Sequence, residues 1–208
     1  MTRNAKIRRS WFSDMPFTRG ALVRRSVRAT ALMVLTLSIS GEALAAVRGI
    51  LNQQAPSWGV ERWVRNPGGD AALDVDDFRG RVVYLYCFQS WCPGCHSRGF
   101  PTLRKIIDRY ADDPEVGIVA VQTVFEGFDA NTPEKAEETA AKYALDIPVG
   151  HSGSSREPSA LMRAYRTGGT PWTVIIDKNG TVRYNGFHIR PEQAINLIGD
   201  LKKEAVAH

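Results

Sequence analysis

The apolar residues of this chain follow two alternating patterns, one typical of buried strands and one typical of helices. Residues 82–88 and 116–124 are apolar runs rich in β-branched and aromatic side chains, as in parallel strands buried on both faces. Between these runs, residues 100–110 place apolar side chains three, four and seven positions apart, which predicts an amphipathic helix. Pro101 should kink this helix, because proline removes a backbone hydrogen bond. The pattern therefore predicts a parallel strand–helix–strand unit.

The rest of the chain continues the alternation. Thr132 followed by Pro133 predicts a helix start, since threonine caps helices and proline suits the first helical position. The Asn-Gly pair at 179–180 predicts a hairpin whose two strands pair antiparallel. The other expected elements are strands at 58–65, 147–151, 170–177 and 181–187 and helices at 157–166 and 191–204. Together these elements predict one α/β domain without internal repeats.

The first 45 residues differ in composition from the remainder. They carry eight of the 27 basic residues and two of the 22 acidic ones, so the positive net charge belongs to this segment. The domain itself is nearly balanced in charge, which argues against a nucleic-acid partner. A basic segment ends at Arg28, an apolar stretch follows at 29–39, and Ala43-Leu44-Ala45 matches a cleavage site.

This pattern predicts an export signal or an N-terminal anchor at residues 1–45. The apolar stretch is shorter than the roughly 20 residues of a membrane-spanning helix, which favours cleavage. Residues 46–56 lack periodicity and are predicted to be a linker, and residues 57–208 form the predicted domain. We therefore expect a periplasmic or other extracytoplasmic location, where disulfides persist. Contact with the membrane is expected only through an uncleaved N-terminal segment.

The sequence Trp-Cys-Pro-Gly-Cys-His at 91–96 carries the candidate chemistry. Two cysteines at this spacing can close a disulfide, bind a metal or attach haem, and the context decides among these. Here the motif follows a buried strand and opens a helix, where the helix dipole favours a thiolate. Because the thiolate is the nucleophile in disulfide exchange, Cys92 is the expected attacking sulfur and Cys95 the resolving one. Cys87, within the strand, is expected to be a small core residue.

The order of these elements resembles the thioredoxin fold. The resemblance rests on the Trp-Cys-x-x-Cys motif at a helix start, the kink at Pro101 and Gly169-Thr170-Pro171 before the hairpin. The helix and strand between residues 132 and 149 resemble an insertion of the exported TlpA/ResA-like thiol–disulfide interchange proteins, which are redoxins. The resemblance covers roughly residues 55–205. It implies an α/β fold with a central mixed sheet flanked by helices, and with this helix and strand inserted before the final hairpin and helix.

The resemblance also implies a binding site around the dithiol. It implies a cis peptide bond at Pro171, with the backbone of Thr170 available to a client peptide. Trp91 and Trp172 are expected to shape the groove on either side. Thioredoxins carry a buried aspartate where this chain has Tyr86, and TlpA-like proteins often carry a glutamate in the region 96–99, where this chain has none.

The proton acceptor of these families is therefore absent from its usual places in this chain. Glu126, at the end of the second strand, is the candidate substitute.

Other interpretations of the motif are less well supported. Haem attachment would use His96 as an axial ligand, but haem proteins of this size are usually helical. A zinc site would need a fourth ligand, for which His151 and His188 have no characteristic spacing. A peroxidase of the peroxiredoxin type needs threonine where this chain has Gln89. The alternatives that remain open are such a peroxidase and a non-enzymatic exported binding module.

The sequence thus predicts an exported thiol–disulfide oxidoreductase that exchanges its dithiol with protein thiols and disulfides. The resemblance favours a reductant that is supplied with electrons by a membrane or soluble donor. No metal and no cofactor are expected.

Overall fold

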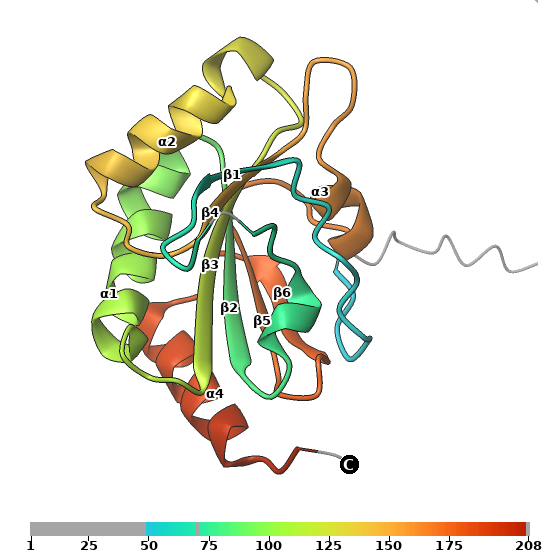
Figure 1. Ribbon diagram of the computed structural model, residues 1–208, viewed down its shortest axis with the longest axis vertical. Coiled ribbons are helices and arrows are strands. Elements are labelled where there is room, and N and C mark those ends of the chain that lie inside the picture. Colours follow the sequence, from blue (N-terminus) through green and yellow to red (C-terminus); the bar gives the residue numbers. More distant parts are fainter. Residues whose placement is uncertain (1–48, 70, 207–208) are drawn as a thin grey trace, which may run out of the picture. The chain divides into compact units, whose positions relative to one another are not determined.

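The computed structural model describes residues 49–69 and 71–206, which form a mixed six-stranded sheet flanked by helices (Figure 1). The strands lie in the order β1-β4-β3-β2-β5-β6. They are β1 (Arg62–Arg65), β2 (Val82–Phe88), β3 (Val116–Thr123), β4 (Val149–Ser152), β5 (Trp172–Ile176) and β6 (Val182–Phe187). The α-helices are α1 (Phe100–Tyr110), α2 (Pro133–Lys142), α3 (Ala160–Tyr165) and α4 (Pro191–Lys203). The predicted α/β thioredoxin-like fold, including the inserted α2 and β4, is confirmed.

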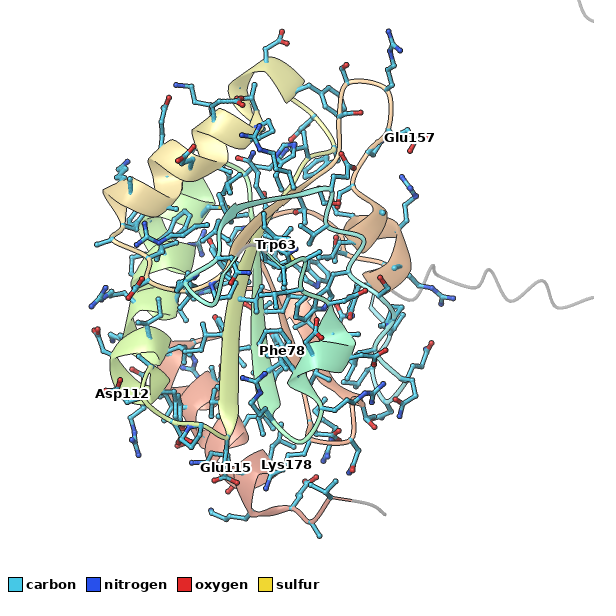
Figure 2. All side chains as sticks on the ribbon, viewed as in Figure 1. Trp63, Phe78, Asp112, Glu115, Glu157 and Lys178 are labelled. Carbon is cyan, nitrogen blue, oxygen red and sulfur yellow. The ribbon has the colours of Figure 1, made fainter. Side chains whose placement is uncertain are left out.

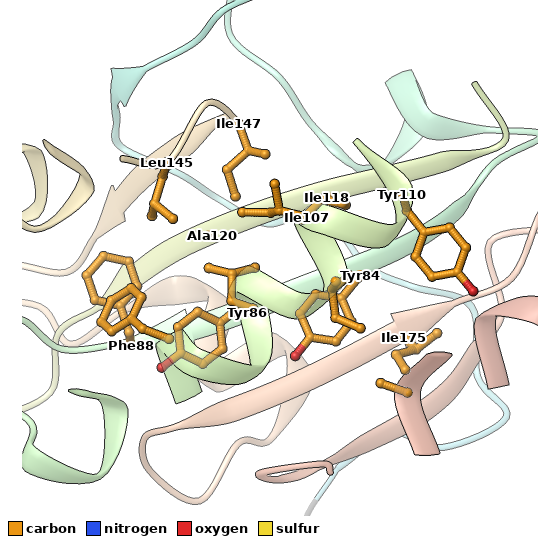
Figure 3. Packing of buried hydrophobic residues seen from close by; sticks show 14 of the residues in the cluster. Tyr84, Tyr86, Phe88, Ile107, Tyr110, Ile118, Ala120, Leu145, Ile147 and Ile175 are labelled. Atoms are coloured by element: carbon orange, nitrogen blue, oxygen red, sulfur yellow. The ribbon is translucent and has the colours of Figure 1, made fainter. Parts of the chain in front are cut away.

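Strand β2 is central to this sheet. It pairs in parallel with β3 and antiparallel with β5, so both of its edges are hydrogen-bonded. All seven of its residues are buried, because helices or loops cover both faces of the sheet. Its alternating side chains divide the core in two: Tyr84, Tyr86 and Phe88 face one cluster (Figure 3), and Val83, Leu85 and Cys87 face the other. The residues that follow Phe88 therefore start from a strand that is hydrogen-bonded along both edges.

The two clusters are covered by different parts of the chain. Helices α1, α2 and α4 pack on the face that carries Tyr86. The other face is covered by α3, by the 3₁₀ turn Val75–Phe78 and by residues 50–58. At the end of the sheet where β3 begins, the Glu115 carboxylate and the Lys178 ammonium group form an ion pair of 3.2 Å (Figure 2). Since β2 and β3 are parallel, the cysteine motif lies at the opposite end.

The N-terminal part of the domain differs from the expected pattern. The first strand spans Arg62–Arg65 rather than 58–65. The described part of the predicted linker, residues 49–56, packs along β6: the N–H of Asn52 and that of Ala55 donate to carbonyls of residues 182 and 180. Ile50 is buried there. Apolar burial and edge pairing thus order a segment that has no periodicity of its own.

The predicted export signal or anchor, residues 1–45, lies outside the described residues. Among the residues that the structure describes, no helix combines the length and the hydropathy that crossing a membrane requires.

Candidate active site

The two cysteines of the motif lie directly beyond the end of β2. Cys92 precedes the first helical residue, Pro93, and its sulfur accepts a hydrogen bond from the backbone N–H of Cys95 at 3.2 Å. On its other side, the Cys92 thiol lies 3.6 Å from the carbonyl oxygen of Thr170. Both cysteines are free thiols; Cys92 is 7% exposed and Cys95 is fully buried. The two sulfurs are therefore neighbours, and Cys92 is the one of the two that keeps some exposure to solvent.

Burial makes the thiol of Cys95 a weak acid. It raises the pKa of Cys95 to about 12, and the hydrogen bond with Cys92 acts in the same direction. The backbone of Gln89 and the side chain of Thr170 oppose this rise through hydrogen bonds to the sulfur. Cys95 is therefore a thiol at neutral pH, held between groups that can stabilise its thiolate when one forms.

The helix that carries Cys95 begins with a wide turn. Residues Cys95–Gly99 are π-helical, and the N–H of Phe100 donates to the carbonyl of Cys95 five residues earlier. Such single turns occur where the ordinary helical hydrogen-bond pattern is disturbed. Here Pro101 follows at once, and it has no N–H to give to the carbonyl of Ser97. The disturbance that Pro101 predicts in this helix is therefore observed as the π-helical turn before it.

The loop before β5 closes the site from the opposite side. The Thr170–Pro171 peptide bond is cis, as the resemblance implied. A side chain at Gly94 would come within 3.3 Å of the Pro171 ring, so the motif and this loop are in close contact. The Thr170 hydroxyl donates to the amide oxygen of Gln89 at 3.4 Å, and the amide nitrogen of Gln89 donates to the carbonyl of Glu126 at 3.0 Å. Gln89 thus joins the loops on both sides of the motif.

The aromatic residues beside the dithiol are not all placed as predicted. Trp91 is 46% exposed, in agreement with a groove residue. Trp172 is buried, and its indole N–H donates to the side-chain oxygen of Asn185 at 2.6 Å. The exposed aromatic ring on that side is Phe187, which is 54% exposed and packs edge-on against Trp172 with centroids 6.5 Å apart. The one signal for Phe187 in the sequence is its place in the predicted hairpin, opposite Trp172.

As the proton acceptor of Cys95, Glu126 remains a prediction. Its side chain is exposed, and the contacts made by this residue are those of its carbonyl, which accepts from Gln89 and Asn131.

His96 is held away from both sulfurs. Its Nε2 lies 2.7 Å from the carbonyl oxygen of Ser90 and its Nδ1 lies 2.7 Å from the hydroxyl of Tyr143. Because a carbonyl only accepts, Nε2 carries the proton. Neither nitrogen remains for the axial ligand that haem attachment would need. Within the described ranges, no three His, Cys, Asp or Glu side chains gather as a metal site would require.

A buried polar network behind the motif was not predicted. Gln122 in β3 accepts hydrogen bonds from the backbone N–H and the hydroxyl of Ser90, and its amide nitrogen donates to the carbonyls of Asn131 and Thr132. It therefore ties the residues just before Trp91 to the start of α2. The available signal was the single amide in the otherwise apolar run 116–124.

Comparison with known proteins agrees with this geometry. The model of the family described as Redoxin matches residues 55–197. The chain belongs to the Redoxin family. Among curated proteins it is similar to the thiol-disulfide oxidoreductases ResA of Geobacillus kaustophilus and of Geobacillus thermodenitrificans, each 28% identical over 110 residues. These matches cover 52% of this chain and 56% of each relative, so the chain spans little more than half the length of the curated relatives.

Solved structures resemble the Redoxin domain over most of its length. One is a thioredoxin-like superfamily protein with a TM-score of 0.66 and 30% identity, covering 74% of this chain and 99% of the other. Another is a thiol-disulfide isomerase from Corynebacterium glutamicum with a TM-score of 0.62 and 31% identity, covering 76% of this chain and 98% of the other.

Proposed function

We propose that this Redoxin domain is an exported thiol–disulfide oxidoreductase that reduces disulfides in protein clients. The observation that carries the proposal is the pairing of Cys92, at a helix start and 7% exposed, with the fully buried thiol of Cys95. The helix start favours the thiolate of Cys92, which is the attacking species in disulfide exchange. The names of the relatives support the same chemistry.

The exchange proceeds in two steps. The Cys92 thiolate attacks one sulfur of the client disulfide, forming a Cys92–client disulfide as the client bond breaks and releases a client thiolate. Cys95 then loses its proton and attacks the Cys92 sulfur. This closes the Cys92–Cys95 disulfide and releases the second client sulfur. Two electrons pass to the client, so a membrane or soluble donor must return two electrons before the next turnover.

The surface around Cys92 fits an extended client segment. The carbonyl of Thr170 lies beside the attacking sulfur, where it can accept a hydrogen bond from a peptide N–H. Trp91 and Phe187 offer exposed aromatic surface for apolar residues that flank the client cysteine. Trp172 is buried beneath this surface and packs against the ring of Phe187.

Cysteine variants test the mechanism in an insulin-reduction assay. Cys92→Ser should reduce activity to the uncatalysed background, and Cys95→Ser should do the same while accumulating a mixed disulfide with the client. Cys87→Ala is the matched control: this thiol is equally buried but faces the other core cluster, so activity should stay within about twofold of wild type. Full activity in both motif variants would refute the mechanism. Mixed-disulfide trapping by Cys92→Ser alone would reverse the two roles.

Export is the second part of the proposal, and it rests on the basic, apolar and small-residue pattern of residues 1–45. N-terminal sequencing of the native protein should find a start close to residue 46 in an extracytoplasmic fraction. A species that begins at Met1 in the soluble cytoplasmic fraction would contradict it.

A further inference from the structure

Tyr86 brings a buried hydroxyl group to Cys95. Its side chain is 1% exposed, and its ring stacks on Phe88 with centroids 6.0 Å apart and meets Phe100 edge-on at 5.3 Å (Figure 3). With the ring held in this way, the hydroxyl oxygen lies 3.5 Å from the carbonyl oxygen of Cys95. Besides burial, the Cys95 side chain also raises the pKa of Tyr86, in keeping with a thiol that lies near the same hydroxyl.

The wide turn that carries Cys95 is shaped to admit this hydroxyl. A Cβ atom at Gly99 would lie 1.9 Å from the Tyr86 oxygen, so only glycine leaves room for it. The carbonyl of Cys95, which in this turn accepts from the N–H of Phe100, is the group that the hydroxyl approaches. The missing side chain at Gly99 in the turn therefore leaves the space that the Tyr86 hydroxyl from β2 occupies.

The Tyr86 hydroxyl keeps its proton and can donate it to a hydrogen bond. Burial, and then the neighbouring Cys95, raise the pKa of Tyr86 well above its ordinary value, so the phenol keeps its proton. A donor that faces a sulfur stabilises the thiolate more than the thiol, because hydrogen bonds to charged groups are the stronger ones.

We propose that Tyr86 is a positioning residue of the dithiol, holding Cys95 in its turn and donating a hydrogen bond as the Cys95 sulfur becomes a thiolate. The inference rests on the proposed disulfide exchange and concerns its second step. Since Tyr86 keeps its proton, the proton of Cys95 passes to the thiolate that the first attack released. The new bond then joins the two motif sulfurs while the Cys92–client bond breaks.

The test separates the two steps with the aromatic disulfide 5,5′-dithiobis(2-nitrobenzoate). Attack by Cys92 releases one coloured thiolate, and attack by Cys95 on the mixed disulfide releases the second. In Tyr86→Phe, the first phase should stay within about twofold of wild type, while the second should slow about tenfold. The midpoint of the pH profile of the second phase should rise by about one pH unit.

Tyr84→Phe is the matched control. Tyr84 lies on the same strand and face, is equally buried, and hydrogen-bonds to Thr173 rather than to the motif. Both phases of this variant should stay within about twofold of wild type. A second phase that is unaffected in Tyr86→Phe, or equal slowing in both variants, would overturn the inference. Release of only one thiolate by the wild-type protein would instead refute the proposed function itself.

A second variant covers the case in which Tyr86→Phe does not fold. Replacing Tyr86 by 3-fluorotyrosine keeps the ring and the hydroxyl and makes the hydroxyl a stronger donor. The second phase should then be about twofold faster than wild type at the same pH, with the first phase unchanged. An unchanged or slower second phase would overturn the inference.

Discussion

At the scale of single residues, the two sulfurs of the motif differ because their surroundings differ. Cys92 keeps 7% exposure and has a backbone N–H and a carbonyl beside it, whereas Cys95 is enclosed by the core and by its own helical turn. The same side chain is therefore the nucleophile at Cys92 and a protonated thiol, used in the second step, at Cys95. The difference in burial is a property of the fold and not of the spacing between the cysteines.

The raised pKa of Cys95 leads to a prediction for alkylation. In Cys92→Ser, burial remains the main cause of the raised pKa of Cys95. Cys95 should therefore stay protonated at pH values well above the ordinary cysteine pKa of roughly 8.5. Its rate of reaction with iodoacetamide should keep rising about tenfold per pH unit beyond pH ~9.5. The same protein unfolded in urea, the control, should reach a plateau near that pH. A plateau near pH 9 in the folded variant would show that burial does not control this thiol.

The residues that sequence could identify are those whose chemistry is local. The two cysteines stand out through their spacing and their strand–helix context. Tyr86, Gln89 and Gln122 did not stand out, because each acts on a residue brought near it by the fold, such as Gly99 or Ser90. Glu126 shows the converse: it follows β3, the parallel neighbour of β2, but its side chain is exposed.

At the scale of elements, the strength of the local pattern decided what could be predicted. Strand β2 begins and ends where the apolar run does, at Val82 and Phe88, because both faces of this strand are buried. Segment 49–56 has no such pattern and takes its order from β6 through long-range hydrogen bonds. The π-helical turn Cys95–Gly99 could be predicted only in part. Pro101 predicted a disturbance there, but the close approach of the Tyr86 hydroxyl to Gly99 involves another element and was not predicted.

At the scale of the domain, the dithiol motif and a group of ion pairs lie at opposite ends of the sheet. The motif, the loop of cis-Pro171 and the exposed rings of Trp91 and Phe187 gather at one end. The other end carries ion pairs, including Glu115 with Lys178 (Figure 2). Lys202 pairs with Asp113 at the same end. The fully paired strands between the ends give the dithiol a rigid support. The direction of electron flow then depends on how strongly this end stabilises the reduced dithiol.

The last prediction concerns the reduction potential, which becomes more oxidising as the folded protein stabilises the Cys92 thiolate more strongly. That sulfur receives one N–H at 3.2 Å and the field of the helix start, whereas His96 is turned toward Ser90 and Tyr143. Modest stabilisation of this kind fits a reductant. Equilibration with defined thiol buffers should give a potential near the roughly −270 mV of thioredoxin. His96→Gln, the control, should leave the potential within about 15 mV, because the imidazole is not directed at the sulfur. A wild-type value near the roughly −120 mV of a strong oxidant would reverse the proposed direction of transfer.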